Sequence, residues 1–195
     1  MIPRAFTLIE LLITVAIIAI LAAIAVPNFL EAQTRSKVSR VKSDLRTLAT
    51  AVEAYSVDFN RPPYDGEPGF AHYGWVEAQK QLTTPVAFLT SLPTDAFQDR
   101  LAPPAPRAGH TNEIGNRHVY DYSTRRWEDV DGTGAQRDGW LRNMGNSAWK
   151  LTSAGPDLRF DNAGSFYGFR ELYDPTNGTI SDGDIVRSQA NVESK

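Results

Sequence analysis

One carboxylate, Glu10, lies inside an apolar run that extends from Phe6 to Pro27. An ionisable group in a membrane helix costs about 3 kcal/mol at the bilayer centre and less near an end, so such a group usually has a function and a partner. The partner of a carboxylate must be a cation or a hydrogen-bond donor. A free α-amine would serve, so Glu10 is a candidate functional residue whose partner is a cation or a donor.

No catalytic motif occurs in the sequence. The chain has no cysteine, which excludes disulfides, cysteine-based zinc sites and a thiol nucleophile. Its three histidines, His72, His110 and His118, lack the spacing of metal ligands, and there is no nucleophile elbow or phosphate loop. A formal net charge of -3 gives no basic footprint for nucleic acid. We therefore expect neither an enzyme nor a nucleic-acid-binding protein.

The apolar run is long enough to span a bilayer. The 21 residues from Phe6 to Val26 include only three polar side chains. As a helix they extend about 31 Å, which is close to the thickness of the hydrocarbon core. A secretory signal peptide, a plain membrane anchor and a buried core helix remain alternatives. Because Pro27 removes a backbone donor, we expect a kink or a locally melted stretch at this residue, or the end of the helix.

A second helical pattern follows the proline. Its apolar residues recur at spacings of three and four, which predicts an amphipathic helix that packs against a sheet of the same chain, with a coiled coil as the alternative. These residues are Val38, Val41, Leu45, Leu48, Val52, Tyr55 and Phe59. The basic residues between positions 35 and 46 could contact lipid headgroups or acidic patches on a neighbouring subunit, or form a solvated face.

Beyond residue 60 the sequence predicts a small head with a sheet. The paired prolines of NRPPYDG (60–66) cannot continue a helix, so they end the amphipathic segment. A short helix is expected at 76–82. The segment DVDGTG (129–134) predicts a glycine-rich turn, with an EF-hand-like metal loop as the alternative. Short, aromatic-flanked segments predict antiparallel strands. The strands are expected at 118–123, 149–153 and 185–187.

The N-terminal sequence RAFTLIELLITVAIIAILAAIAVPNFLEAQ resembles the prepilin-type N-terminus of type IV pilins and type II secretion pseudopilins. In that family a leader is cut before a Phe, the new N-terminus is methylated, and Glu and Pro stand at the fifth and twenty-second mature positions. With Phe6 as the first mature residue, Glu10 is the fifth and Pro27 the twenty-second. The resemblance implies cleavage between Ala5 and Phe6, N-methylation of Phe6, assembly through Glu10 and a helix kink at Pro27. Ala5 stands where the family usually has glycine.

The resemblance also implies the organisation of the chain. A leader peptide (1–5) precedes a transmembrane and assembly helix (6–27), an amphipathic helix (28–60) and a globular head (61–195). The implied fold class is α+β, with the long N-terminal helix packed on a small antiparallel sheet. The segment AFLTSLPTDAF (87–97) is similar to the Leu-Pro-x-Asp loop that precedes the sheet in pseudopilins.

The implied function is that of a structural subunit of a type II secretion pseudopilus or a type IV pilus-like filament. Such a subunit is stored as a single-pass protein of the bacterial inner membrane, with its N-terminus cytoplasmic and its head outside. It then joins a periplasmic or extracellular filament. The expected partners are other pilin subunits, prepilin peptidase, the inner-membrane assembly machinery and membrane lipid. The alternative is a membrane-anchored extracytoplasmic binding module or enzyme that uses the helix only as an anchor.

Two aspartate-rich segments, WKLTSAGPDLRFD and GTISDGDIVRS, resemble the calcium-binding closing region of major pseudopilins. The resemblance carries Asp157 into the first element and Asp182 and Asp184 into the second. Between them lies an insert in which Asp161 or Asp174 could replace or add a ligand. Calcium takes six to eight oxygen ligands, which carboxylates and the carbonyls of glycine-rich turns supply. Alternatively, these aspartates only stabilise turns. The implied site, and the lack of the C-terminal cysteine loop common in type IV pilins, favour a major pseudopilin.

Overall fold

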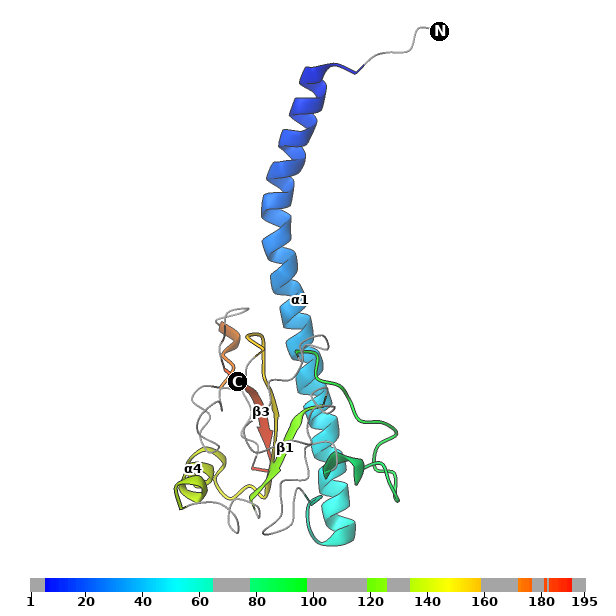
Figure 1. Ribbon diagram of the computed structural model, residues 1–195, viewed down its shortest axis with the longest axis vertical. Coiled ribbons are helices and arrows are strands. Elements are labelled where there is room, and N and C mark those ends of the chain that lie inside the picture. Colours follow the sequence, from blue (N-terminus) through cyan, green and yellow to red (C-terminus); the bar gives the residue numbers. More distant parts are fainter. Residues whose placement is uncertain are drawn as a thin grey trace, which may run out of the picture.

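The computed structural model describes residues 6–64, 78–97, 119–125, 134–158, 172–176, 181 and 183–190. Within these residues a long N-terminal helix projects from a small head (Figure 1). The elements in chain order are α1 (Leu8–Phe59), β1 (Asp121–Thr124), α4 (Gly134–Met144), β2 (Trp149–Ser153) and β3 (Ile185–Ser188).

Helix α1 begins at a side-chain cap and ends at a left-handed residue. Thr7 caps its N-terminus, and Asn60, with φ 53°, ends it. The helix runs through Pro27 without a break, so the two helices expected at 6–27 and 28–60 are one element and the proline does not end it. The ribbon curves gently along its length (Figure 1), as long helices commonly do. A kink at Pro27 stays a prediction.

The N-terminal half of α1 is apolar and exposed. The helix is long and apolar enough to cross a membrane, and its most apolar window is 0% buried within the chain. The alternative of a buried core helix is therefore wrong. A continuous apolar surface of this size is unfavourable in water, so it requires lipid or another protein.

Within the described residues, three antiparallel strands form a sheet in the order β1-β2-β3. The central strand β2 places Leu151 opposite Tyr122 of β1 and opposite Arg187 of β3. Strand β2 has the predicted bounds, β3 is one residue longer than predicted, and β1 begins at Asp121 rather than at residue 118. The α+β fold with a long helix on a small antiparallel sheet is confirmed.

The main core lies between the C-terminal half of α1 and one face of the sheet. Leu45, Leu48 and Val52 of α1 are fully buried and share one apolar cluster with Tyr122 and Leu151. The predicted amphipathic stripe therefore packs on the sheet of its own chain and does not form a coiled coil within it. This packing holds the head on the C-terminal half of α1 and leaves the apolar N-terminal half free of the head (Figure 1).

Helix α4 packs on β3 through a second, smaller apolar cluster. Trp140 and Met144 form this cluster with Val186 of β3. The Trp140 indole donates a hydrogen bond of 2.9 Å to the carbonyl of Ser147. The sequence predicts no helix here, and Gly134, placed by it in a turn, is the first residue of α4. Tertiary burial of Trp140 explains how a short helix with little apolar periodicity forms.

The short helix expected at 76–82 is described from residue 78 onward. Residues 78–80 are helical, and a turn follows them. Leu82 is fully buried, so this segment contributes to the main core.

Candidate assembly site

The carboxylate of Glu10 is held by the residue that caps its own helix. The Thr7 backbone N–H and hydroxyl donate hydrogen bonds of 2.9 Å and 2.7 Å to Glu10 Oε2. The Glu10 backbone N–H in turn donates to Thr7 Oγ1 at 3.2 Å. This reciprocal capping box satisfies two backbone donors at the helix start. Among the described residues, the hydrogen bonds to this carboxylate use only Oε2.

The surroundings of Glu10 are apolar side chains without contacts to the head. Phe6 is 70% exposed, and Leu8, Ile9 and Leu11 are exposed as well. Ala5, the predicted residue before the cleavage site, lies outside the described residues. The site therefore consists of one carboxylate, locally capped, on a helix surface that another apolar body must cover.

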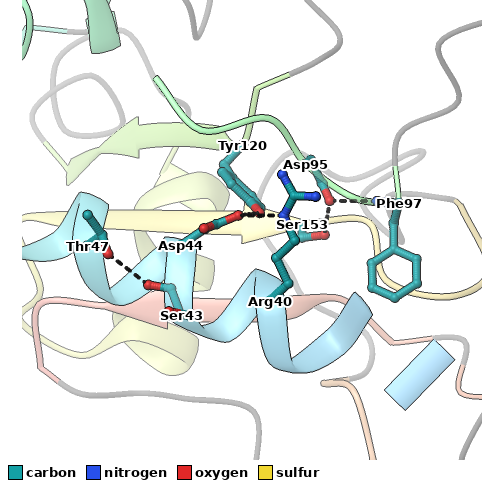
Figure 2. Close-up of polar contacts among 8 residues, drawn as sticks. All are labelled: Arg40, Ser43, Asp44, Thr47, Asp95, Phe97, Tyr120 and Ser153. Atoms are coloured by element: carbon teal, nitrogen blue, oxygen red, sulfur yellow. Dashed lines mark hydrogen bonds and ion pairs between the residues drawn. The ribbon is translucent and has the colours of Figure 1, made fainter. Parts of the chain in front are cut away.

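A second polar cluster, which the sequence did not predict, joins α1 to the head (Figure 2). The Tyr120 hydroxyl, just before β1, donates a hydrogen bond of 2.9 Å to Asp44 Oδ2 on α1. Arg40 Nε lies 3.6 Å from the same Asp44 oxygen. Burial, and then the hydrogen bond to Asp44, raise the pKa of the Tyr120 hydroxyl far above its ordinary value. Tyr120 therefore stays protonated and serves as a donor.

Asp95, in the predicted Leu-Pro-x-Asp loop, ties this loop to the end of β2. Its Oδ1 accepts hydrogen bonds from the Phe97 N–H at 2.9 Å and from the Ser153 hydroxyl at 2.8 Å (Figure 2). The residue is 4% exposed. Burial raises the pKa of the Asp95 carboxyl, the hydrogen bonds from Phe97 and Ser153 oppose this shift, and the charge of Asp44 adds to it.

We expect Asp95→Asn to reduce the pH dependence of head stability. Because the folded state holds the Asp95 proton more tightly than the unfolded state, the free energy of unfolding falls as pH rises from the ordinary value of 3.8 through the raised pKa. The asparagine side chain does not titrate in this range, so the free energy of unfolding should fall less as the pH rises. Thermal unfolding of the detergent-solubilised chain across this pH range measures it, with the exposed Asp138→Asn as the matched control. An equal decline in both variants would contradict the assignment.

The two aspartate-rich segments meet in the structure at glycines. A Cβ added to Gly155, which has φ +72°, would lie 2.7 Å from the carbonyl oxygen of Gly183. The carbonyl of Asp184 accepts a hydrogen bond of 2.9 Å from the Tyr173 N–H. Thus the segment with Asp157 and the segment with Asp184 lie side by side, as the predicted calcium site requires.

The predicted calcium ligands are only partly covered by the structure. Asp184 is buried, with 1% exposure, and Asp157 is half-buried. Asp161 and Asp182 lie outside the described residues. Within the described part of the chain, no three histidine or acidic side chains form a group that could hold a metal ion. A nearby aspartate, Asp174, accepts hydrogen bonds from the Thr176 N–H and hydroxyl, so it stabilises a turn.

Comparison with known proteins gives one family match and several relatives. The family described as "Prokaryotic N-terminal methylation motif" matches residues 3–26. Over 111 residues the chain is 40% identical to the type IV major pilin protein PilA of Myxococcus xanthus, which covers 49% of this chain and 50% of that protein. Over 72 residues it is 46% identical to the type IV major fimbrial protein FimA of Dichelobacter nodosus, covering 37% and 42%.

A relative from a secretion system also matches. Over 53 residues the chain is 40% identical to the type II secretion system core protein G of Pseudomonas aeruginosa, covering 27% of this chain and 37% of that protein. The chain thus spans half or less of the length of these curated relatives. No solved structure matches the chain significantly.

Proposed function

We propose that this chain, which carries the N-terminal motif of the type IV pilin and pseudopilin family, is a structural subunit of a filament made of such subunits. The observation that carries the proposal is the exposed apolar half of α1, with one carboxylate near its start, on a helix whose other half packs the head. The relatives are structural subunits rather than enzymes, which agrees with the absence of catalytic motifs.

Storage and assembly use the same helix surface. In the membrane the apolar half of α1 contacts lipid, and in the filament it contacts the helices of other subunits. Both environments are apolar, so the transfer between them does not expose this surface to water. The head stays outside the bundle because its core is built on the other half of α1.

Glu10 provides the polar contact that selects the docked position. Cleavage before Phe6 would create a free amine, and this amine of one subunit would pair with Glu10 of its neighbour. The capping box with Thr7 holds the carboxylate until then. A buried charge without a partner is heavily penalised, so the pair disfavours every register in which the two groups do not meet.

The mature protein extracted from membranes should begin at Phe6 and carry one extra methyl group. Prepilin peptidase is the expected partner in this step, because residues 3–26 match the methylation motif. Mass spectrometry of the intact protein measures both changes. Substitution of Ala5 by Gly, the usual family residue, should leave the product unchanged. An intact Met1 on the assembled protein would contradict the proposed processing.

The proposed location is the bacterial inner membrane, with the N-terminus cytoplasmic and the head extracytoplasmic. The filament would then be extended by an inner-membrane assembly machinery. Within this function we favour a major pseudopilin over a surface pilus subunit, on the implied calcium site and the absence of cysteine. Deletion of the gene distinguishes the two assignments. If the chain is a pseudopilin, exported proteins should stay in the periplasm; if it is a pilin, surface filaments should be lost.

We also propose calcium as a ligand of the head. Asp157 and Asp184, with Asp161 and Asp182, would supply carboxylate oxygens, and the neighbouring glycine-rich turns would supply carbonyls. The support is the close approach of Gly155 to Gly183, which brings the two segments together. When bound, calcium would link the two segments and stabilise the C-terminal part of the head.

Calcium should raise the temperature at which the head unfolds, and chelation should lower it. An ion that binds only the folded state stabilises it in proportion to the logarithm of its concentration, by about 2.7 kcal/mol at a hundredfold excess over its dissociation constant. In Asp157→Asn the calcium response should be lost, whereas Asp138→Asn, exposed on α4 and outside the two segments, should keep it. A wild-type chain that does not respond to calcium would remove this proposal and leave the filament function intact.

A further inference from the structure

We propose that three cations just beyond the apolar half of α1, Arg35, Lys37 and Arg40, bind the anionic headgroups of membrane phospholipids. We call these residues the basic collar. The inference rests on the proposed storage of the subunit in a membrane. The proposed partner of these cations is lipid phosphate rather than an acidic surface of another subunit.

The basic collar lies where the membrane surface is expected. Exposed apolar side chains continue along α1 to Phe29 and Leu30, which are 62% and 55% exposed. Along the helix axis, Arg35 lies about 8 Å beyond Leu30 and Arg40 about 15 Å beyond it. The headgroup layer is roughly 5 to 8 Å thick on each side of the hydrocarbon core. Long, flexible Lys and Arg side chains extend the reach of the collar to this layer.

The side chain of Arg35 leans toward the membrane. Side chains of an α-helix tilt toward its N-terminus, which here is the membrane side. Arg35 Nη2 lies 2.6 Å from Glu31 Oε1, one turn closer to the apolar half. Both side chains are well exposed, at 67% and 46%. An exposed pair of this kind contributes little to stability, so Arg35 can exchange the carboxylate for a lipid phosphate.

The collar faces more than one side of α1. Each residue turns the helix by about 100°, so Lys37 lies about 200° around the axis from Arg35. Lys37 Nζ lies 5.9 Å from the centroid of the Phe97 ring, and the Arg40 side chain remains 62% exposed beside Asp44. One docked protein would cover one side of the helix, whereas lipids surround it. The placement therefore favours lipid as the partner.

The charge of this segment supports the same partner. From Glu31 to Asp44 the helix carries four cations and two acids, a net charge of +2. Anionic lipid attracts each nearby Lys or Arg enough to favour its binding about fivefold. A subunit with this collar would thus be held at a defined depth, at a bilayer surface that contains anionic lipid.

The experiment uses the full chain, one copy per nanodisc, in mixed phosphatidylcholine and phosphatidylglycerol. Native mass spectrometry then counts the molecules of each lipid type that stay bound when the protein is released from the disc. We expect phosphatidylglycerol to be enriched over its share of the disc. The double variant Arg35→Gln and Lys37→Gln should lower this enrichment by about fivefold or more. Arg61→Gln, just beyond the C-terminal end of α1, is the control and should leave the enrichment unchanged.

Several results would overturn the proposed lipid contact. They are an unenriched lipid ratio in the wild-type chain, full enrichment in the double variant, and an equal loss in Arg61→Gln. Enrichment that needs two copies in one disc would assign the lipid site to a subunit interface and also overturn it. Hydrogen exchange of the apolar half of α1 separates the two proposals. If the helix is inserted but phosphatidylglycerol is not enriched, only the proposed lipid contact is contradicted. If the helix lies outside the disc, the proposed membrane storage is contradicted.

Discussion

The Glu10→Leu variant is expected to enter membranes as well as the wild-type chain and to form almost no filaments. Leucine removes the cost of placing a carboxylate in the bilayer, so membrane insertion of α1 should not decrease. Filament assembly should decrease, because in the proposed pair the amine of the neighbouring Phe6 loses its partner. Removing one member of a buried ion pair costs about 3 to 5 kcal/mol. This corresponds to at least about a hundredfold weaker association of subunits.

Membrane fractionation and the yield of sheared filaments measure the two effects separately. Thr14→Val is the matched control, because Thr14 lies one turn from Glu10 and its hydroxyl donates only to the Glu10 backbone carbonyl, at 2.6 Å. This variant also loses a polar group from the apolar run, and it should assemble normally. Normal filaments from Glu10→Leu would remove the proposed pairing and favour a helix that serves only as an anchor.

The Gly183→Ala variant is expected to destabilise the head by about 3 kcal/mol or more. The added Cβ would lie 2.6 Å from the Leu172 carbonyl oxygen and 2.7 Å from the Tyr173 nitrogen. These are backbone atoms, so no change of rotamer relieves the contact. Residues 172–173 and 183–184 must therefore move apart, which also strains the hydrogen bond of 2.9 Å from the Tyr173 N–H to the Asp184 carbonyl.

Gly145→Ala separates this steric effect from the loss of a glycine. Gly145 has φ +56°, and no atom lies within 4 Å of its added Cβ. Its substitution should cost only the left-handed conformation, about 1 to 2 kcal/mol. Thermal unfolding of the detergent-solubilised variants compares the two. Equal destabilisation would mean that the contact between Gly183 and Leu172 is not tight in solution.

Glu10 could be located from sequence because its signal is local. A carboxylate in an apolar run is unusual at any position, and Phe6 and Glu10 both lie within the methylation motif matched at residues 3–26. The structure adds that Thr7 holds the carboxylate through a capping box. The pair was visible in the sequence as a Thr followed three residues later by a Glu, before an apolar run.

The contacts that join the head to α1 could not be predicted in this way. Tyr120 lies 76 residues from its acceptor Asp44, and Ser153 lies 58 residues from Asp95. The sequence marked Asp95 as part of a loop, but nothing near it in the chain indicates which donor it meets. Such partners depend on how α1, the loop and the sheet pack together, and packing involves the whole chain.

The sequence by itself determined the membrane-length helix, the amphipathic stripe, the carboxylate of Glu10 within the apolar run and the bounds of β2. Each depends on residues within a few positions of one another, because helical and strand periodicity and capping are local interactions. Only the tertiary structure decided that α4 forms around Trp140 and that Gly183 lies against the Leu172 backbone. These features depend on burial and close contact between distant segments, which local preference does not encode.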